Sequence, residues 1–289
     1  MVSHNGACSI PWGKTRLLVL GYARNFIPCR RPSDWYKHGK EYAKKSTGCY
    51  RPGSQKNSIM IPRKISYPKV SVIVAVYNQE RFIGRCLRSL LHQSMPHTDY
   101  EIIVVNDGST DRTDYALSLF CDPKDSVVQL FQNKTNHGLP AALNVGIRAA
   151  RAPYIVRVDS DDFVNTNFLN FLHYYLESNS HADAVACDYL VLDDAEKVIE
   201  RVSCEEKPIA CGILFRTAHL IEIGLYDENF RCHEEKELRV RFEKKYRIDC
   251  LKLPLYRYRK HNSNITSDTT QMERHRQKLI QKHGAQAGA

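Results

Sequence analysis

The sequence lacks any run of about 18 apolar residues, which is the length that a membrane-spanning helix needs. The closest N-terminal candidate for the apolar core of a signal peptide is Leu17–Leu20, which is short and lies near Arg16 and Arg24. We therefore expect no transmembrane segment and no secretory signal. The chain is expected to be cytoplasmic.

Cys-x-x-Cys pairs are also absent, although the chain has ten cysteines. This absence argues against a zinc site and against a thioredoxin-like motif. Cys86 stands beside Leu87 and Leu90, where a small buried apolar residue would fit. We predict reduced thiols rather than disulfides, as is usual in the cytoplasm.

Acidic residues are scarce in residues 1–69, which contain 14 Lys or Arg but only Asp34 and Glu41. Residues 70–289 contain 28 basic and 30 acidic residues, so the basic excess belongs to the N-terminal segment. We predict an irregular basic N-terminal extension over 1–69, which is either solvated or in contact with anionic lipid, nucleic acid or an acidic partner. Contact with anionic lipid would place the chain peripherally at the inner membrane face.

Apolar strands alternate with amphipathic helices from residue 70 onward, which predicts βαβ units and an α/β fold. The expected strands are Val70–Tyr77, Glu101–Val105, Val127–Phe131 and Tyr154–Val158, and the expected helical faces are Phe82–Leu91 and Leu139–Ile147. The central sheet should be mainly parallel and flanked by helices. We place this domain at 70–265, followed by a polar tail at 266–289 that is helical from Thr270 to Lys282.

Polar clusters follow three of these strands, at Tyr77-Asn78, Asn106-Asp107 and Asp159–Asp162. Ligands of parallel α/β sheets bind beyond the carboxyl ends of the strands, so the clusters are expected to form one site. Two carboxylates at Asp159 and Asp161 can share a hard divalent cation, Mg²⁺ or Mn²⁺. The alternative is that Asp161 or Asp162 caps a helix beginning near Asn165.

Six segments in a fixed order resemble the family 2 glycosyltransferases of the GT-A nucleotide-diphospho-sugar transferase fold. They are Val72–Glu80, Ile103–Asp111, Asn136–Asn144, Val158–Asp162, Gly224–Leu238 and Tyr258–His261. The resemblance implies a metal-dependent enzyme that transfers a sugar, with inversion, from a UDP-linked donor to a glycan or glycolipid acceptor. It further implies that Asp159-Ser160-Asp161 is the metal and diphosphate motif.

The resemblance also implies roles for single residues. Those expected around the nucleotide sugar are Ala75, Tyr77, Glu80, Asp107, Gly138, Asn144, Asp159 and Ser160. The metal would be held by Asp161 and Asp159, with His261 touching the metal or the diphosphate. Glu235 matches the catalytic base.

Arg157 is a charge on a buried strand and needs a partner, which could be the donor phosphate or a core carboxylate. The pair Glu234-Glu235 departs from the Glu-Asp of the family, so either glutamate could be the base. An inactive scaffold that binds through its basic N-terminus stays an alternative. A nucleotidyltransferase is disfavoured, because Tyr77–Glu80 is not a Gly-rich basic loop.

Overall fold

The structure is a computed structural model that describes residues 67–121, 127–261 and 269–284. Four parallel strands form the first half of the central sheet, in the spatial order β3-β2-β1-β4. They are β1 (Val70–Val76), β2 (Tyr100–Asp107), β3 (Val128–Asn133) and β4 (Tyr154–Arg157). Every residue of β1, β2 and β4 is buried, which explains their nearly continuous apolar sequences. The predicted parallel strands are confirmed.

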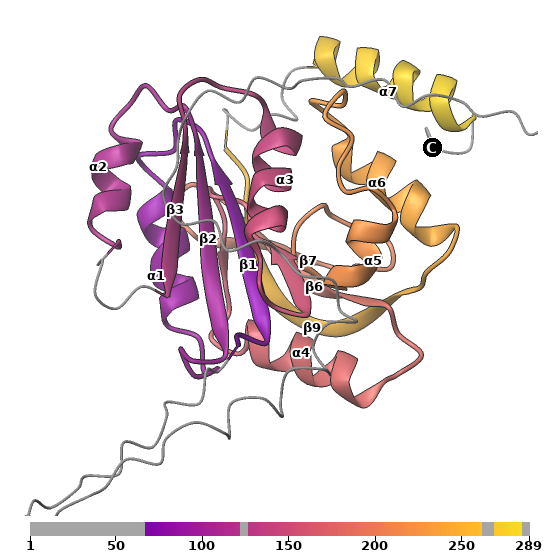
Figure 1. The fold of residues 1–289 in the computed structure, drawn as a ribbon, viewed down its shortest axis with the longest axis horizontal. Coiled ribbons are helices and arrows are strands. Elements are labelled where there is room, and N and C mark those ends of the chain that lie inside the picture. Colours follow the sequence, from indigo (N-terminus) through magenta and orange to yellow (C-terminus); the bar gives the residue numbers. More distant parts are fainter. Residues whose placement is uncertain (1–66, 122–126, 262–268, 285–289) are drawn as a thin grey trace, which may run out of the picture. The chain divides into compact units, whose positions relative to one another are not determined.

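Helices cover both faces of this sheet, and each face has its own apolar core. One core includes side chains of α1 (Ile83–Leu91), α2 (Thr113–Ser118) and α4 (Phe168–Ser178). The other includes side chains of α3 (Leu139–Ala149), α5 (Thr217–Glu222) and α6 (Glu234–Glu243). Figure 1 shows α2 and α3 on opposite sides of β1–β3.

The second half of the sheet is mixed. Its strands are β5 (Phe163–Val164), β6 (Ala184–Leu192), β7 (Val198–Val202), β8 (Ile213–Arg216) and β9 (Ile248–Arg259). Strand β8 runs antiparallel to β4 and β6, whereas β6 and β9 are parallel. The α/β fold with flanking helices is therefore confirmed, and the parallel pairs are those among the first four strands and that of β6 with β9.

The predicted C-terminal helix is present as α7 (Thr269–His283). Lys282 of this helix forms ion pairs with Asp227 at 2.7 Å and with Glu237 of α6 at 2.6 Å. Residues 1–66, which make up nearly all of the predicted basic extension, lie outside the described residues. The predicted lipid contact of this extension therefore stays a prediction. Within the described ranges, no helix is long and apolar enough to cross a membrane.

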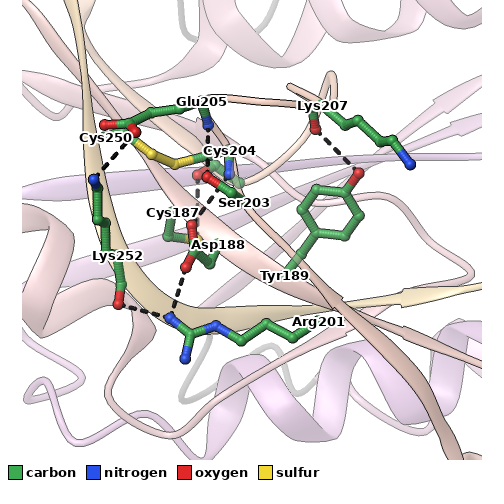
Figure 2. Close-up of a disulfide and its surroundings, with 11 residues drawn as sticks. Cys187, Asp188, Tyr189, Arg201, Ser203, Cys204, Glu205, Lys207, Cys250 and Lys252 are labelled. Carbon is green, nitrogen blue, oxygen red and sulfur yellow. Dashed lines mark hydrogen bonds and ion pairs between the residues drawn. A yellow bond between two sulfur atoms is a disulfide. The ribbon is translucent and has the colours of Figure 1, made fainter.

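The prediction of reduced thiols is wrong for one pair, because Cys204 and Cys250 form a disulfide (Figure 2). The two cysteines are 46 residues apart, and pairing of β9 with β6 brings Cys250 beside the segment that follows β7. The Cys204 amide donates to Asp188, and Arg201 donates to the same carboxylate. Cys86 is a buried free thiol, as predicted.

Candidate active site

A cavity of about 1050 Å³ lies at the carboxyl ends of β1, β2 and β4, where the sequence predicts the site. Ten of the predicted site residues line it: Ala75, Tyr77, Asp107, Gly138, Arg157, Asp159, Ser160, Asp161, Glu234 and Glu235. The structure therefore brings together segments that are far apart in the sequence. This shared position makes the cavity the candidate site for ligand binding and chemistry.

Asp107 at the end of β2 organises the loop that leads into α3. Its carboxylate accepts hydrogen bonds from the Asn133 side chain at 2.7 Å and from the backbone N–H groups of His137 and Gly138. Gly138, which precedes the first residue of α3, has φ 95° and so adopts a conformation that favours glycine. Asp107 thus fixes one rim of the cavity as well as lining it.

Arg157, the last residue of β4, is buried and paired with two carboxylates. Its Nε and Nη2 donate to Asp159 at 2.6 and 3.3 Å, and its Nη1 donates to Glu234 at 2.9 Å. Of the two partners considered from the sequence, the structure therefore supplies core carboxylates. This guanidinium links the end of the sheet to the first turn of α6.

Asp161 faces the same cavity and is held by His261. The Nε2 atom of His261 lies 3.0 Å from Asp161 Oδ2, and the imidazole stacks on Phe82 with ring centroids 4.7 Å apart. His261 itself does not appear among the described residues that line the cavity. Its position next to Asp161 means that it orients this carboxylate.

Asp162 does not cap a helix, because it is buried and bonded elsewhere. It accepts hydrogen bonds from the Tyr256 hydroxyl at 2.8 Å and from the Arg259 backbone N–H at 2.7 Å. The helix expected near Asn165 begins at Phe168, and Asn167 precedes it. The structure therefore contradicts the alternative that Asp161 or Asp162 caps this helix.

The acidic cluster has the donor chemistry of a divalent-cation site. Burial, followed by repulsion from Asp159, raises the pKa of Asp161. Asp159 also groups with Asp162 and Cys211, but burial raises the pKa of the Cys211 thiol well above its usual range, so it is a poor ligand for a hard cation. Crowded carboxylate oxygens that open into a cavity fit Mg²⁺ or Mn²⁺.

The two glutamates at the start of α6 differ in environment. Glu234 is 5% exposed and bonded to Arg157, and burial raises its pKa to about 7 although Arg157 opposes the shift. Glu235 also lines the cavity but forms no hydrogen bond or ion pair with any residue in the described part of the chain. His233, just before them, has φ 58°, a left-handed conformation that is uncommon for a residue other than glycine.

Besides His261, two predicted residues are not among those that line the cavity. Asn144 is buried in α3, where its side chain exchanges hydrogen bonds with the backbone of Tyr226 and donates to Glu228. Glu80 accepts a hydrogen bond from the Arg112 backbone N–H, and so links the loop after β1 to the loop after β2. Both residues support the walls of the site in this structure.

Several lining residues are not predicted from the sequence, among them Tyr189, Val191, Arg231, His233 and Met272. They come from β6, from the segment before α6 and from α7. Tyr189 and Val191 share one face of β6, but almost the whole strand is buried, so its sequence does not mark that face as a cavity wall. The positions of Arg231 and Met272 depend on long-range packing, for which the sequence carries no local signal.

Comparison with known proteins identifies the class. Residues 71–221 match the family model described as glycosyl transferase family 2. EpsJ of Bacillus subtilis strain 168, described as an uncharacterized glycosyltransferase, is 31% identical over 248 residues, covering 74% of this chain and 68% of EpsJ. The chain belongs to glycosyl transferase family 2 and is a glycosyltransferase.

Solved structures agree with this fold. S. aureus TarS 1-349 in complex with UDP-GlcNAc superposes with a TM-score of 0.60 and 23% identity, covering 76% of this chain and 70% of that chain. The mannosyltransferase PcManGT from Pyrobaculum calidifontis, in complex with GDP-Man and Mn²⁺, gives a TM-score of 0.57 and 19% identity, covering 74% and 65%. The predicted GT-A fold is thereby confirmed.

Proposed function

We propose that this glycosyltransferase moves a sugar from a UDP-linked donor to a hydroxyl group of a glycan or glycolipid acceptor, with inversion at the anomeric carbon. One observation carries the proposal. The carboxylate of Glu235, which has no hydrogen bond or ion pair within the described residues, opens into the same cavity as Asp159 and Asp161, at the carboxyl ends of the parallel strands. A base and a diphosphate site in one cavity are what single-step transfer from a nucleotide sugar requires.

In this proposal Glu235 is the base and Glu234 is not. A sugar hydroxyl is a poor nucleophile, and a carboxylate within hydrogen-bond reach can take its proton as the new bond forms. Glu234 is occupied by Arg157, whereas Glu235 is available. The acceptor oxygen bonds to the anomeric carbon, the bond from that carbon to the phosphate oxygen breaks, and the acceptor proton moves to Glu235.

Asp159 and Asp161 would hold the divalent metal, with His261 fixing the orientation of Asp161. When bound, such a cation stabilises the negative charge that develops on the leaving diphosphate. Arg157 keeps Asp159 in place through two hydrogen bonds. PcManGT binds Mn²⁺ on the same fold, and this supports the choice of Mn²⁺ or Mg²⁺.

The nucleoside would lie near Ala75, Tyr77 and Asp107. Strands β1 and β2 are in register at Val76 and Asn106, so these residues share one end of the cavity. Tyr77 is 43% exposed there and offers an aromatic face. TarS takes UDP-GlcNAc on this fold, and that supports a UDP-linked donor for this chain.

A screen of nucleotide-sugar donors with Mn²⁺ tests the proposal, with thermal stability and nucleoside diphosphate release as readouts. A bound donor raises the melting temperature by mass action, even without the acceptor. Asp161→Asn should lose both the Mn²⁺-dependent shift and the release. The matched control Asp194→Asn, at an exposed position, should keep both. An unchanged Mn²⁺ response in Asp161→Asn would overturn the metal assignment.

A further inference from the structure

Arg231 projects from the segment before α6 into the candidate active site. Its neighbours Phe230 and Cys232 are buried, with 1% and 3% exposure, so the backbone at Arg231 is anchored on both sides. The arginine itself is exposed and lines the cavity. The buried neighbours therefore fix the backbone position from which the Arg231 side chain enters the cavity.

Among the described residues, no charge around the cavity pairs with this guanidinium. The described lining residues include five carboxylates and two arginines. Arg157 is fully engaged by Asp159 and Glu234. Arg231, in contrast, forms no hydrogen bond or ion pair with any residue that the structure describes. An unpaired guanidinium with several N–H donors in a binding cavity is suited to bind a ligand oxygen.

The position of Arg231 within the cavity follows from its distance to Gly138. A Cβ atom at Gly138 would lie 3.8 Å from both Cγ and Nε of Arg231. The Gly138 N–H in turn donates to Asp107 at 2.8 Å. Arg231 is therefore at the end of the cavity formed by Asp107, Ala75 and Tyr77, where the proposed function places the nucleoside.

We propose that Arg231 is a specificity-determining residue that donates hydrogen bonds to a carbonyl oxygen of the donor's nucleobase. This inference rests on the proposed function and deepens it. Uracil carries carbonyl oxygens, whereas adenine carries none and presents an amino group. A guanidinium has hydrogen-bond donors only, so it favours uracil. Against adenine its N–H groups would be left without an acceptor.

The experiment measures dissociation constants of UDP, uridine and ADP in the presence of Mn²⁺. They are compared for the wild type, Arg231→Ala and Arg231→Lys, with Arg88→Ala as the control. Arg88 is an exposed arginine of α1 that does not line the cavity. Thermal unfolding of each variant without ligand checks that the fold is intact.

Arg231→Ala should raise the dissociation constants of UDP and uridine by a similar factor of roughly 10 to 100, as expected for loss of a hydrogen bond from a charged donor. ADP affinity should stay unchanged, so that the preference for UDP over ADP collapses. Arg231→Lys should recover part of the loss, and Arg88→Ala should match the wild type.

If Arg231→Ala lost affinity equally for UDP and ADP and kept its affinity for uridine, Arg231 would bind the diphosphate. That result would overturn the inference. Unchanged UDP affinity in Arg231→Ala would overturn it as well, while leaving the proposed function in place. A wild-type chain that binds no nucleoside diphosphate would instead contradict the proposed function, and the inference with it.

Discussion

Arg157 at the end of β4 and Glu234 at the start of α6 form a buried ion pair, with Nη1 and Oε1 2.9 Å apart. Both side chains are almost inaccessible to solvent, at 7% and 6% exposure. Because the same guanidinium also holds Asp159, the pair connects the acidic cluster to the helix that carries Glu235. This contact distinguishes two adjacent glutamates, of which the resemblance matches Glu235 to the base while leaving Glu234 as an alternative.

The first prediction concerns stability. Glu234→Ala leaves the buried Arg157 without one of its two carboxylates, and breaking such a pair typically costs about 3–5 kcal/mol. Glu235→Ala removes a carboxylate that has no such partner and should change the free energy of unfolding much less. Urea denaturation of both variants measures the difference. Equal destabilisation by the two substitutions would contradict the assigned environments.

The disulfide between Cys204 and Cys250 gives a second prediction. It ties the segment after β7 to β9, and the same segment carries Pro208–Cys211, which line the cavity. Cys250→Ala should lower the free energy of unfolding by roughly 2–4 kcal/mol, because the unfolded chain loses a cross-link. A reducing agent should destabilise the wild type to a similar extent and leave Cys250→Ala unchanged. A wild type insensitive to reductant would mean that the two thiols are not bonded.

The third prediction is a pH dependence at the contact between α7 and the rest of the domain. Burial alone would raise the pKa of Asp227, but hydrogen bonds from Lys282 and Asn229 outweigh it and lower the pKa to about 2. The unfolded value is about 3.9. The carboxylate therefore contributes stability that is fully present above pH ~4 and is lost as pH falls towards 2.

Asp227→Asn should consequently be less stable than the wild type at neutral pH, and the gap between the two should close between about pH 4 and pH 2. Denaturation curves at several pH values measure this gap. Asp194→Asn is the control, because Asp194 is exposed and its substitution should give no pH-dependent gap. A gap that is constant over the whole range would show that the Asp227 charge is not responsible.

The sequence predicts those parts of the fold that depend on local pattern. Strands β1, β2 and β4 are predicted from their continuous apolar runs, and α3 is predicted from the periodicity of its apolar face. Asp159 and Asp161 are found because they follow a buried strand. Contacts between distant segments leave no such trace. The pairing of Arg157 with Glu234, the Cys204–Cys250 disulfide and the approach of Arg231 to Gly138 each join residues at least 46 positions apart.

The second half of the sheet was hard to predict for a related reason. Strand β8 is only four residues long and runs antiparallel between β4 and β6, so its direction is set by packing. Strand β7 has four exposed residues out of five, and so it has no apolar alternation to detect. The walls that these strands support, including Tyr189 and Val191, could therefore not be assigned in advance.

The central claim is that Glu235 acts as the base in sugar transfer, and Glu235→Gln tests it most directly. Glutamine keeps the size of the side chain but cannot take a proton. The measurement is nucleoside diphosphate release from the donor that stabilises the chain with Mn²⁺, alongside the donor dissociation constant. We predict release slower by roughly 10²–10⁴-fold with donor affinity unchanged. Release at the wild-type rate from Glu235→Gln would contradict the account.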